Sequence, residues 1–219
     1  MMPPTTVVFD MDGVLLDSGD AWDKVLQSLF RACDRPWSDV DQRAFAGGDN
    51  SKQWAAYLRH IHDLPMSVDE IVSWVTDGLL EEFHRSLPLL PGAVAAVKRI
   101  GARCKLGLAS SSPREVIEYV LQASGLAAQF TAWASSDDVS GGKPAPDVYL
   151  LVCALLGAPP ETALAIEDSP MGIASAKAAG LRVIAIPQRW FPLAAETLAT
   201  ADLVLASLDQ LQPETLSKL

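Results

Sequence analysis

The chain has few cysteines, an excess of acidic over basic residues, and no long apolar run. Its three cysteines, Cys33, Cys104 and Cys153, are widely spaced and lack metal-ligand spacing, so we expect reduced thiols in a cytoplasmic protein. Lysine and arginine number 17 against 27 acidic residues, and this net charge of −10 argues against nucleic-acid binding and against attraction to an anionic membrane. The longest apolar stretch, 150–158, is too short to span a bilayer.

The remaining composition is that of an ordinary globular protein, with 49% apolar and 20% charged residues. A length of 219 residues fits one domain with a large insertion or two small domains. No strand pattern is evident between Asp17 and about Pro88, where the sequence predicts helices over 19–33, 38–46, 51–62 and 67–86. The chain therefore begins with a short strand at 5–10 and continues into a helical segment.

From Leu89 onward, short apolar strands alternate with amphipathic helices. Strands are predicted over 105–109, 130–134, 163–166 and 182–186, and a terminal helix near 207–218. This alternation is typical of βαβ units and indicates an α/β fold with a mostly parallel sheet. Because the first strand has to join that sheet, the helical segment is interpreted as an all-helical cap inserted after it.

Two carboxylates, Asp10 and Asp12, stand at the end of the first predicted strand. Residues two apart in extended chain point the same way, and the carboxyl end of a strand is where open α/β sheets bind ligands. Two carboxylates this close repel each other unless a cation lies between them or one is protonated. An acidic turn is the alternative, whereas a calcium-binding loop is excluded because Ala21 occupies the twelfth position, where glutamate is needed.

Polar residues also follow three later predicted strands, namely Ser110, Ser111, Lys143, Glu167 and Asp168. Taken singly, Ser110 or Asp168 is explained as a helix cap and Lys143 as a solvated loop lysine. In a parallel sheet, however, all these strand ends lie on one edge. Together with the two aspartates they predict oxygen ligands for a hard divalent cation, with a hydroxyl and a lysine for phosphate oxygens.

Four motifs in this order resemble the haloacid dehalogenase superfamily: Asp10-x-Asp12-Gly13, Ser110, Lys143-Pro144 and Glu167-Asp168-Ser169. The similarity is to the branch whose helical cap follows the first motif, and within it to sugar-phosphate phosphatases and beta-phosphoglucomutases. It implies a Rossmann-like, three-layer α/β/α core from 1–16 and 88–219, with a helical cap over 17–87. It also implies Mg²⁺ and an aspartyl-phosphate intermediate.

The resemblance assigns roles to the matching residues. Asp10 is the expected nucleophile, and Asp12 the general acid for the leaving alcohol and then the base for water. Mg²⁺ is expected on Asp10, on the backbone carbonyl of Asp12 and on Asp168, with Glu167 in support. Phosphate oxygens are expected on Lys143 and Ser110 and on the backbone N–H groups near Met11 and Ser111.

The resemblance leaves phosphatase and mutase open as alternatives. Mutases of the beta-phosphoglucomutase type carry a cap histidine where this chain has Trp22, and a cap-loop arginine at about Asn50. Both departures favour a phosphatase and make Trp22 and Asn50 candidates for substrate contact. The segment Asp17 to Pro88 has seven basic and thirteen acidic residues, which favours a neutral leaving group such as a sugar or polyol.

The function predicted is Mg²⁺-dependent hydrolysis of a small phosphorylated metabolite, and the second aspartate of the first motif favours phosphate-ester over dehalogenation chemistry. A remote alternative is a non-catalytic phosphate-binding or regulatory module on the same fold. That module would be expected to have lost at least one of Asp10, Asp12, Lys143 and Asp168, and all four are present. The sequence leaves the oligomeric state open, and a monomer is compatible with it.

Overall fold

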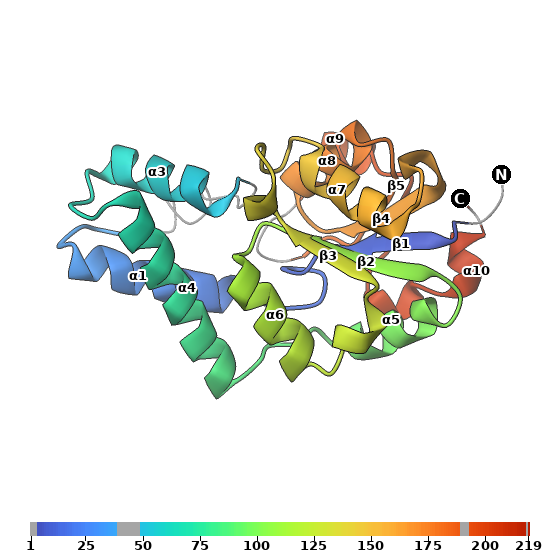
Figure 1. Ribbon diagram of the computed structural model, residues 1–219, viewed down its shortest axis with the longest axis horizontal. Helices are drawn as coiled ribbons and strands as arrows, with labels where there is room; N and C mark the ends of the chain where they lie inside the picture. The colour runs from blue at the N-terminus through green and yellow to red at the C-terminus, as the bar shows by residue number, and fades with distance from the viewer. Residues whose placement is uncertain (1–3, 39–48, 189–192, 218) are drawn as a thin grey trace.

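A six-stranded, all-parallel sheet in the order β3-β2-β1-β4-β5-β6 forms the core of the computed structural model (Figure 1). The structure describes residues 4–38, 49–188, 193–217 and 219. The strands are β1 Thr6–Phe9, β2 Lys105–Ser110, β3 Ala132–Ser135, β4 Ala163–Glu167, β5 Arg182–Ala185 and β6 Leu203–Val204. β1 lies between β2 and β4. The chain adds β2 and β3 on one side of β1 and then β4, β5 and β6 on the other, so the order of the strands reverses beside β1.

Helices cover both faces of the sheet (Figure 1). One face packs against α5 (Ala93–Gly101), α6 (Arg114–Ala123) and α10 (Pro213–Leu216), and the other against α7 (Asp147–Leu156), α8 (Pro170–Ala178) and α9 (Ala195–Leu198). Every residue of β1 is buried, as expected for a parallel strand covered on both faces. The predicted three-layer, Rossmann-like α/β/α fold is confirmed.

Of the helices described between β1 and β2, α5 packs on the sheet, and three others extend away from it (Figure 1): α1 Gly19–Ala32, α3 Ser51–His62 and α4 Val68–Arg85. Capping boxes begin two of them, Asn50 with Gln53 at α3 and Ser67 with Glu70 at α4. No strand occurs among the described residues from 17 to 87. The predicted boundaries of the cap, at residues 17 and 87, stay a prediction.

The two segments that lead into and out of these helices run side by side. Asp17 N donates to Pro88 O at 2.8 Å, and Leu90 N donates to Leu15 O at 2.9 Å. Leu16 also forms an isolated antiparallel bridge with Leu89. The helical segment is therefore attached to the sheet through a paired connection.

The C-terminal prediction was wrong. In place of one helix near 207–218, the structure has a 3₁₀ turn at Leu208–Gln210 and the short α10. Leu211 leaves helical geometry with ψ of 86°, and Pro213 disfavours helical geometry in the residue before it.

The predicted helix 38–46 falls almost entirely in residues 39–48, which lie outside the described residues. In the parts of the chain that the structure describes, no helix is long and apolar enough to cross a membrane.

Candidate active site

The carboxyl ends of β1 and β4 bring buried charges together. Asp10 follows β1 and Glu167 ends β4, in strands whose register pairs Phe9 with Ile166. The Lys143 ammonium, from the loop before α7, donates to Asp10 Oδ1 at 2.6 Å and to Glu167 Oε1 at 2.7 Å. All three charged side chains are buried. The strand ends therefore converge as the sequence predicted.

Negative charge exceeds positive charge in this cluster. Carboxylate oxygens of Asp10, Glu167 and Asp168 lie within 4.8 Å of one another, and the Lys143 ammonium pairs with two of them, those of Asp10 and Glu167. Burial raises the pKa of Asp10 to about 8; Lys143 opposes this increase, and Glu167 and Asp12 add to it. Burial and the charges of Glu167 and Asp10 also raise the pKa of Asp168 well above its ordinary value.

Lys143 stays protonated in this environment. Burial alone would lower the pKa of its ammonium, but the negative charges of Asp10 and Glu167 hold that pKa above its ordinary value. One ammonium offsets only one of the three carboxylates when all are ionised. A divalent cation held by carboxylate oxygens would offset the remainder, so the donor set fits a hard metal ion.

The Glu167 carboxylate is saturated by hydrogen-bond donors. Its Oε1 accepts from Lys143 Nζ and from the buried Tyr149 hydroxyl at 2.7 Å, and its Oε2 accepts from Asp168 N at 3.1 Å and from Ser169 N and Oγ, each at 3.2 Å. The Asp168 carboxylate, by contrast, accepts no hydrogen bond from the described residues. Asp168 and the second oxygen of Asp10 are thus the oxygens with room for a cation, while Glu167 holds Lys143 in place.

Two glycines make space for these carboxylates. A Cβ on Gly13 would lie 1.8 Å from Asp168 Oδ2, and a Cβ on Gly172 would lie 1.8 Å from Glu167 Oε1. Gly13 also has φ of 77°, a conformation that other residues rarely adopt. The loop after β1 and the first turn of α8 can therefore approach the acidic cluster only because both positions lack side chains.

The Asp12 side chain lies outside the cluster of three carboxylates and is held by three donors. Its Oδ1 accepts from Ser18 Oγ at 2.6 Å and from Trp22 Nε1 at 3.4 Å, and its Oδ2 accepts from Ser112 Oγ at 2.7 Å. Ser18 and Trp22 come from the start of the helical segment and Ser112 from the loop after β2. Asp12 thus links the two parts of the fold, and its contact with a metal stays a prediction.

The other predicted contact residues lie around this centre. Ser110 is buried at the end of β2, and its Oγ accepts from Ser112 N at 3.0 Å. Ser111 Oγ lies 3.2 Å from Ser136 Oγ, and Trp22 packs edge-on against Trp54 at 6.1 Å between ring centroids. The Asn50 side chain caps α3 by accepting from the backbone N–H three residues on, at 3.0 Å. Substrate contacts of these residues stay predictions.

Three residues that contact the site were missed from the sequence: Ser18, Ser112 and Tyr149. Ser112 belongs to a run of three serines, and alternation alone does not tell which hydroxyl faces Asp12. Ser18 directly follows the first motif, a position that could have suggested a partner for Asp12. Tyr149 gives no sequence signal, because its partner Glu167 belongs to a different element of the fold.

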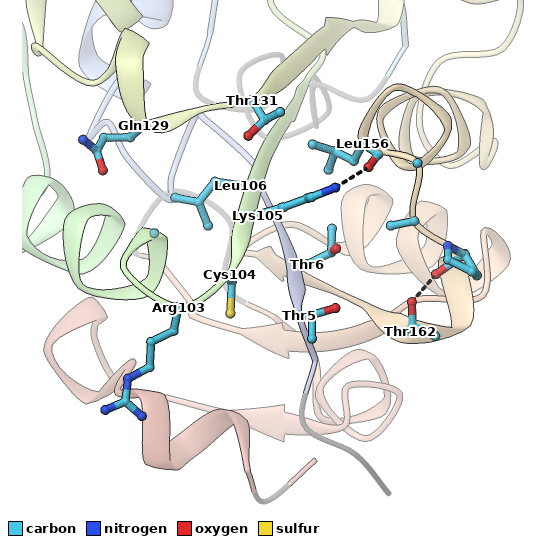
Figure 2. Close-up of a pocket in the computed structure, with 14 residues that line it drawn as sticks. Thr5, Thr6, Arg103, Cys104, Lys105, Leu106, Gln129, Thr131, Leu156 and Thr162 are labelled. Carbon is cyan, nitrogen blue, oxygen red and sulfur yellow. Dashed lines mark hydrogen bonds between the residues drawn. The ribbon is translucent and has the colours of Figure 1, made fainter.

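The opposite edge of the sheet carries a different hollow, of about 550 Å³, at the amino ends of β1 and β2 (Figure 2). Thr5, Thr6, Arg103 and Lys105 are among its lining residues, and none of the described residues that line it carries a carboxylate side chain. Lys105 Nζ lies 3.5 Å from Leu156 O, while the Arg103 side chain extends away from it (Figure 2). The polar groups of this hollow diverge, so it is not the candidate reaction centre.

Comparisons with known proteins agree with this geometry. The sequence model of the family described as haloacid dehalogenase-like hydrolase matches residues 4–180. The chain is 34% identical to Hexitol phosphatase B of Escherichia coli (strain K12) over 95% of each chain, and 31% identical to Validoxylamine A 7'-phosphate phosphatase of Streptomyces hygroscopicus subsp. limoneus over 94% of each. It superposes on the crystal structure of CbbY from Rhodobacter sphaeroides in complex with phosphate with a TM-score of 0.89, at 26% identity, over 99% of this chain and 100% of that one.

Proposed function

The chain belongs to the haloacid dehalogenase-like hydrolases and is a phosphatase of that family, and on this premise we propose that it hydrolyses a sugar or polyol phosphate with Mg²⁺. The observation that carries the proposal is the buried cluster of Asp10, Glu167 and Asp168 around one ammonium, Lys143. Such a cluster stabilises a transferring phosphoryl group chiefly by position and charge. We place the reaction in the cytoplasm, on the cysteine content of the chain.

In the proposed reaction, the carboxylate of Asp10 attacks the substrate phosphorus and displaces the alcohol. The bond between phosphorus and the ester oxygen breaks, and Asp12 gives its proton to that oxygen. Water then attacks the aspartyl-phosphate while Asp12 takes a proton back, so phosphate leaves and both aspartates return to their starting state. The hydrogen bonds from Ser18, Trp22 and Ser112 support this role because they fix the Asp12 carboxylate in one orientation.

The same cluster would hold the metal and the phosphate. Asp10 and Asp168 would hold Mg²⁺ through the oxygens that accept no hydrogen bond from the described part of the chain, and Asp12 would contribute its backbone carbonyl. When bound, Mg²⁺ supplies the positive charge that offsets repulsion between the carboxylates and the phosphate dianion. Lys143, held by Glu167, would bind a non-bridging phosphate oxygen, together with Ser110 and the backbone near Ser111.

A small neutral leaving group fits the helical segment over the site. The two relatives described above are named as phosphatases of hexitols and of validoxylamine A 7'-phosphate. The Trp22 indole N–H donates to Asp12, and the Trp22 ring packs against the Trp54 ring. These two contacts place an aromatic surface beside the reacting groups. Trp22 and Asn50 are our candidates for contact with the sugar or polyol, and the family's mutases carry other residues at both positions.

The test is phosphate release from a panel of small phosphomonoesters with Mg²⁺ and with EDTA. The panel includes sorbitol 6-phosphate and beta-glucose 1-phosphate, the latter also assayed for glucose 6-phosphate. We expect hydrolysis of a sugar or polyol phosphate that EDTA abolishes. Glucose 6-phosphate with little free phosphate would establish the mutase instead. No Mg²⁺-dependent turnover of any ester would favour the non-catalytic module.

A further inference from the structure

A second contact joins the helical segment to the sheet, at the first turn of α3. Ser51 N donates to Asp137 Oδ1 at 2.7 Å, and Gly142 N donates to Gln53 Oε1 at 3.4 Å. Asp137 belongs to the 3₁₀ turn η2 (Ser136–Asp138) that follows β3, and Gly142 directly precedes Lys143. The first turn of α3 thus faces the loop after β3 (Figure 1) and the loop that carries Lys143.

Gly142 shows how closely the two parts approach. A Cβ at this position would lie 2.3 Å from Asn50 N and 2.5 Å from the carbonyl carbon of Asp49, both of them backbone atoms. Gly142 does not have the left-handed φ that would demand glycine for its own conformation. The backbone of residues 49–50 occupies the space that a side chain at position 142 would need, so the contact itself explains why this residue is glycine.

The donor at this contact is one that the helix leaves without an internal partner. The first N–H groups of an α-helix have no acceptor within the helix. At α3 the capping box satisfies Gln53 N with Asn50 Oδ1, and Asn50 N with Gln53 Oε1. Ser51 N is satisfied by the Asp137 carboxylate, whose negative charge also suits the positive end of the helix dipole.

The contact lies far along the chain from the paired connection. In the described ranges, the other side-chain bonds between the two parts are close to that connection: Ser18 and Trp22 donate to Asp12, and the Tyr119 hydroxyl donates to Phe83 O at 3.3 Å near the end of α4. Bonds near a connection limit rotation only weakly, because they lie close to its axis. A bond at the first turn of α3 restrains the segment at a distance from that axis.

We propose that Asp137 is a positioning residue, whose bond to Ser51 N docks α3 on the core and sets Asn50 against the Lys143 loop. The catalytic part of this inference rests on the proposed function. The docking part does not, because it concerns the position of α3 alone. A docked α3 places its N-terminal residues next to the loop that supplies Lys143, so substrate binding would depend on Asp137 although Asp137 takes part in no chemical step.

The docking is tested by hydrogen–deuterium exchange of the full chain, followed in peptides covering 49–56, with 93–101 of α5 as the internal reference. Asp137→Ala removes the acceptor, and we expect exchange in 49–56 to rise by roughly tenfold, the loss of one hydrogen bond to a charged group. Asp137→Asn keeps an oxygen acceptor and should restore most of the protection. Gly142→Ala should raise exchange in 49–56 at least as much, because its Cβ displaces residues 49–50.

The matched control is Asp138→Asn, in the same turn. Among the described residues, Asp138 bonds on the core side alone, accepting from Arg114 Nη2 at 2.6 Å and from Ser135 N at 2.9 Å. We expect wild-type exchange in 49–56 for this variant and unchanged exchange in 93–101 for all four variants. Equal exchange in 49–56 for wild type and Asp137→Ala overturns the proposal, and so does an increase that Asp138→Asn reproduces.

The kinetic arm uses p-nitrophenyl phosphate with Mg²⁺. A positioning role predicts that Asp137→Ala raises KM by roughly threefold to tenfold with a smaller change in kcat, and that Asp137→Asn restores KM. A fall in kcat at unchanged KM overturns the positioning role. If the wild type hydrolyses neither p-nitrophenyl phosphate nor any ester of the panel above, the proposed function fails, and the exchange measurement still decides the docking.

Discussion

The two edges of the same sheet carry polar groups in opposite arrangements. At the carboxyl edge, Lys143 Nζ lies 2.6 Å from Asp10 and 2.7 Å from Glu167, and all three side chains are buried. At the amino edge, Lys105 and Arg103 are exposed, point apart and have no ion pair among the described residues (Figure 2). Both edges of the sheet carry basic side chains, but of these three only Lys143, at the carboxyl edge, meets carboxylates within the described part of the chain.

The difference follows from how loops leave a parallel sheet. At the carboxyl edge, the Asp10 loop, the loop before α7 and the β4–α8 turn all fold over the same point beside β1, where the sheet order reverses. At the amino edge, helices end and strands begin without a shared centre, so the Arg103 and Lys105 side chains stay exposed to solvent. Hence charge alone does not make a site, and the predictions below test convergence.

The largest expected effect is loss of turnover in Asp10→Asn. The amide cannot act as the nucleophile, so we expect Mg²⁺-dependent phosphate release to fall by at least about a thousandfold. The fold should persist, because the amide oxygen can still accept from Lys143 and one of three clustered negative charges is gone. Circular dichroism and the melting temperature report the fold. Activity within tenfold of wild type would contradict the assignment of Asp10.

The second effect concerns the stability of the metal-free protein against pH. Burial raises the pKa of Asp10 in the folded chain from 3.8 to about 8, so the folded state holds a proton that the unfolded state has lost. The protonated Asp10 therefore makes its full contribution to the free energy of unfolding below about pH 4, and this contribution is lost as the pH rises through about 8. We expect the melting temperature of EDTA-treated protein to fall by more than about 5 °C between pH 5 and pH 9.

Two comparisons isolate the cause of that decline. Excess Mg²⁺ should reduce it, because the cation offsets the ionised carboxylates and binds the folded state. Asp10→Asn should also reduce the fall in melting temperature. Part of the fall should remain in this variant, because the pKa of Asp168 is raised as well. A metal-free wild type whose melting temperature is as flat as that of the variant would refute this account.

A smaller effect is expected for Tyr149→Phe, which removes one donor from the buried cluster. The Tyr149 hydroxyl donates to Glu167 Oε1 at 2.7 Å, and a bond to a charged group contributes roughly 1.5–3 kcal/mol. Tyr119→Phe is the matched control, because its hydroxyl donates to the neutral Phe83 carbonyl at 3.3 Å and should contribute about 0.5–1 kcal/mol. Urea unfolding measures both, and equal losses would contradict the special place of Glu167.

The sheet and its converging edge were predictable because the relevant signals are local. β1, β2, β4 and β5 are short apolar runs, and polar residues follow at the point where a parallel sheet brings its strand ends together. Asp10, Glu167 and Asp168 could be grouped for this reason before any coordinates. The family resemblance then assigned them roles that the spacing alone left open.

What escaped prediction depends on orientation or on long-range contact. Ser112, rather than its two neighbours, bonds the Asp12 carboxylate, and only the turn geometry decides this. Asp137 meets Ser51 from 86 positions away in the chain. The prediction of one terminal helix failed for the opposite reason, since Pro213 and the extended Gln212 before it interrupt the local helical pattern.

The smallest effect is expected at the amino edge, with Lys105→Ala. Lys105 is exposed at the start of β2 and lies only 3.5 Å from Leu156 O, at the limit of a hydrogen bond. We expect the free energy of unfolding to change by less than about 0.5 kcal/mol, and kcat/KM with Mg²⁺ by less than about twofold. Urea unfolding and steady-state hydrolysis measure the two quantities. A tenfold loss of kcat/KM would break the comparison between the edges, because a diverging cation would then act on the reaction from the far side of the sheet.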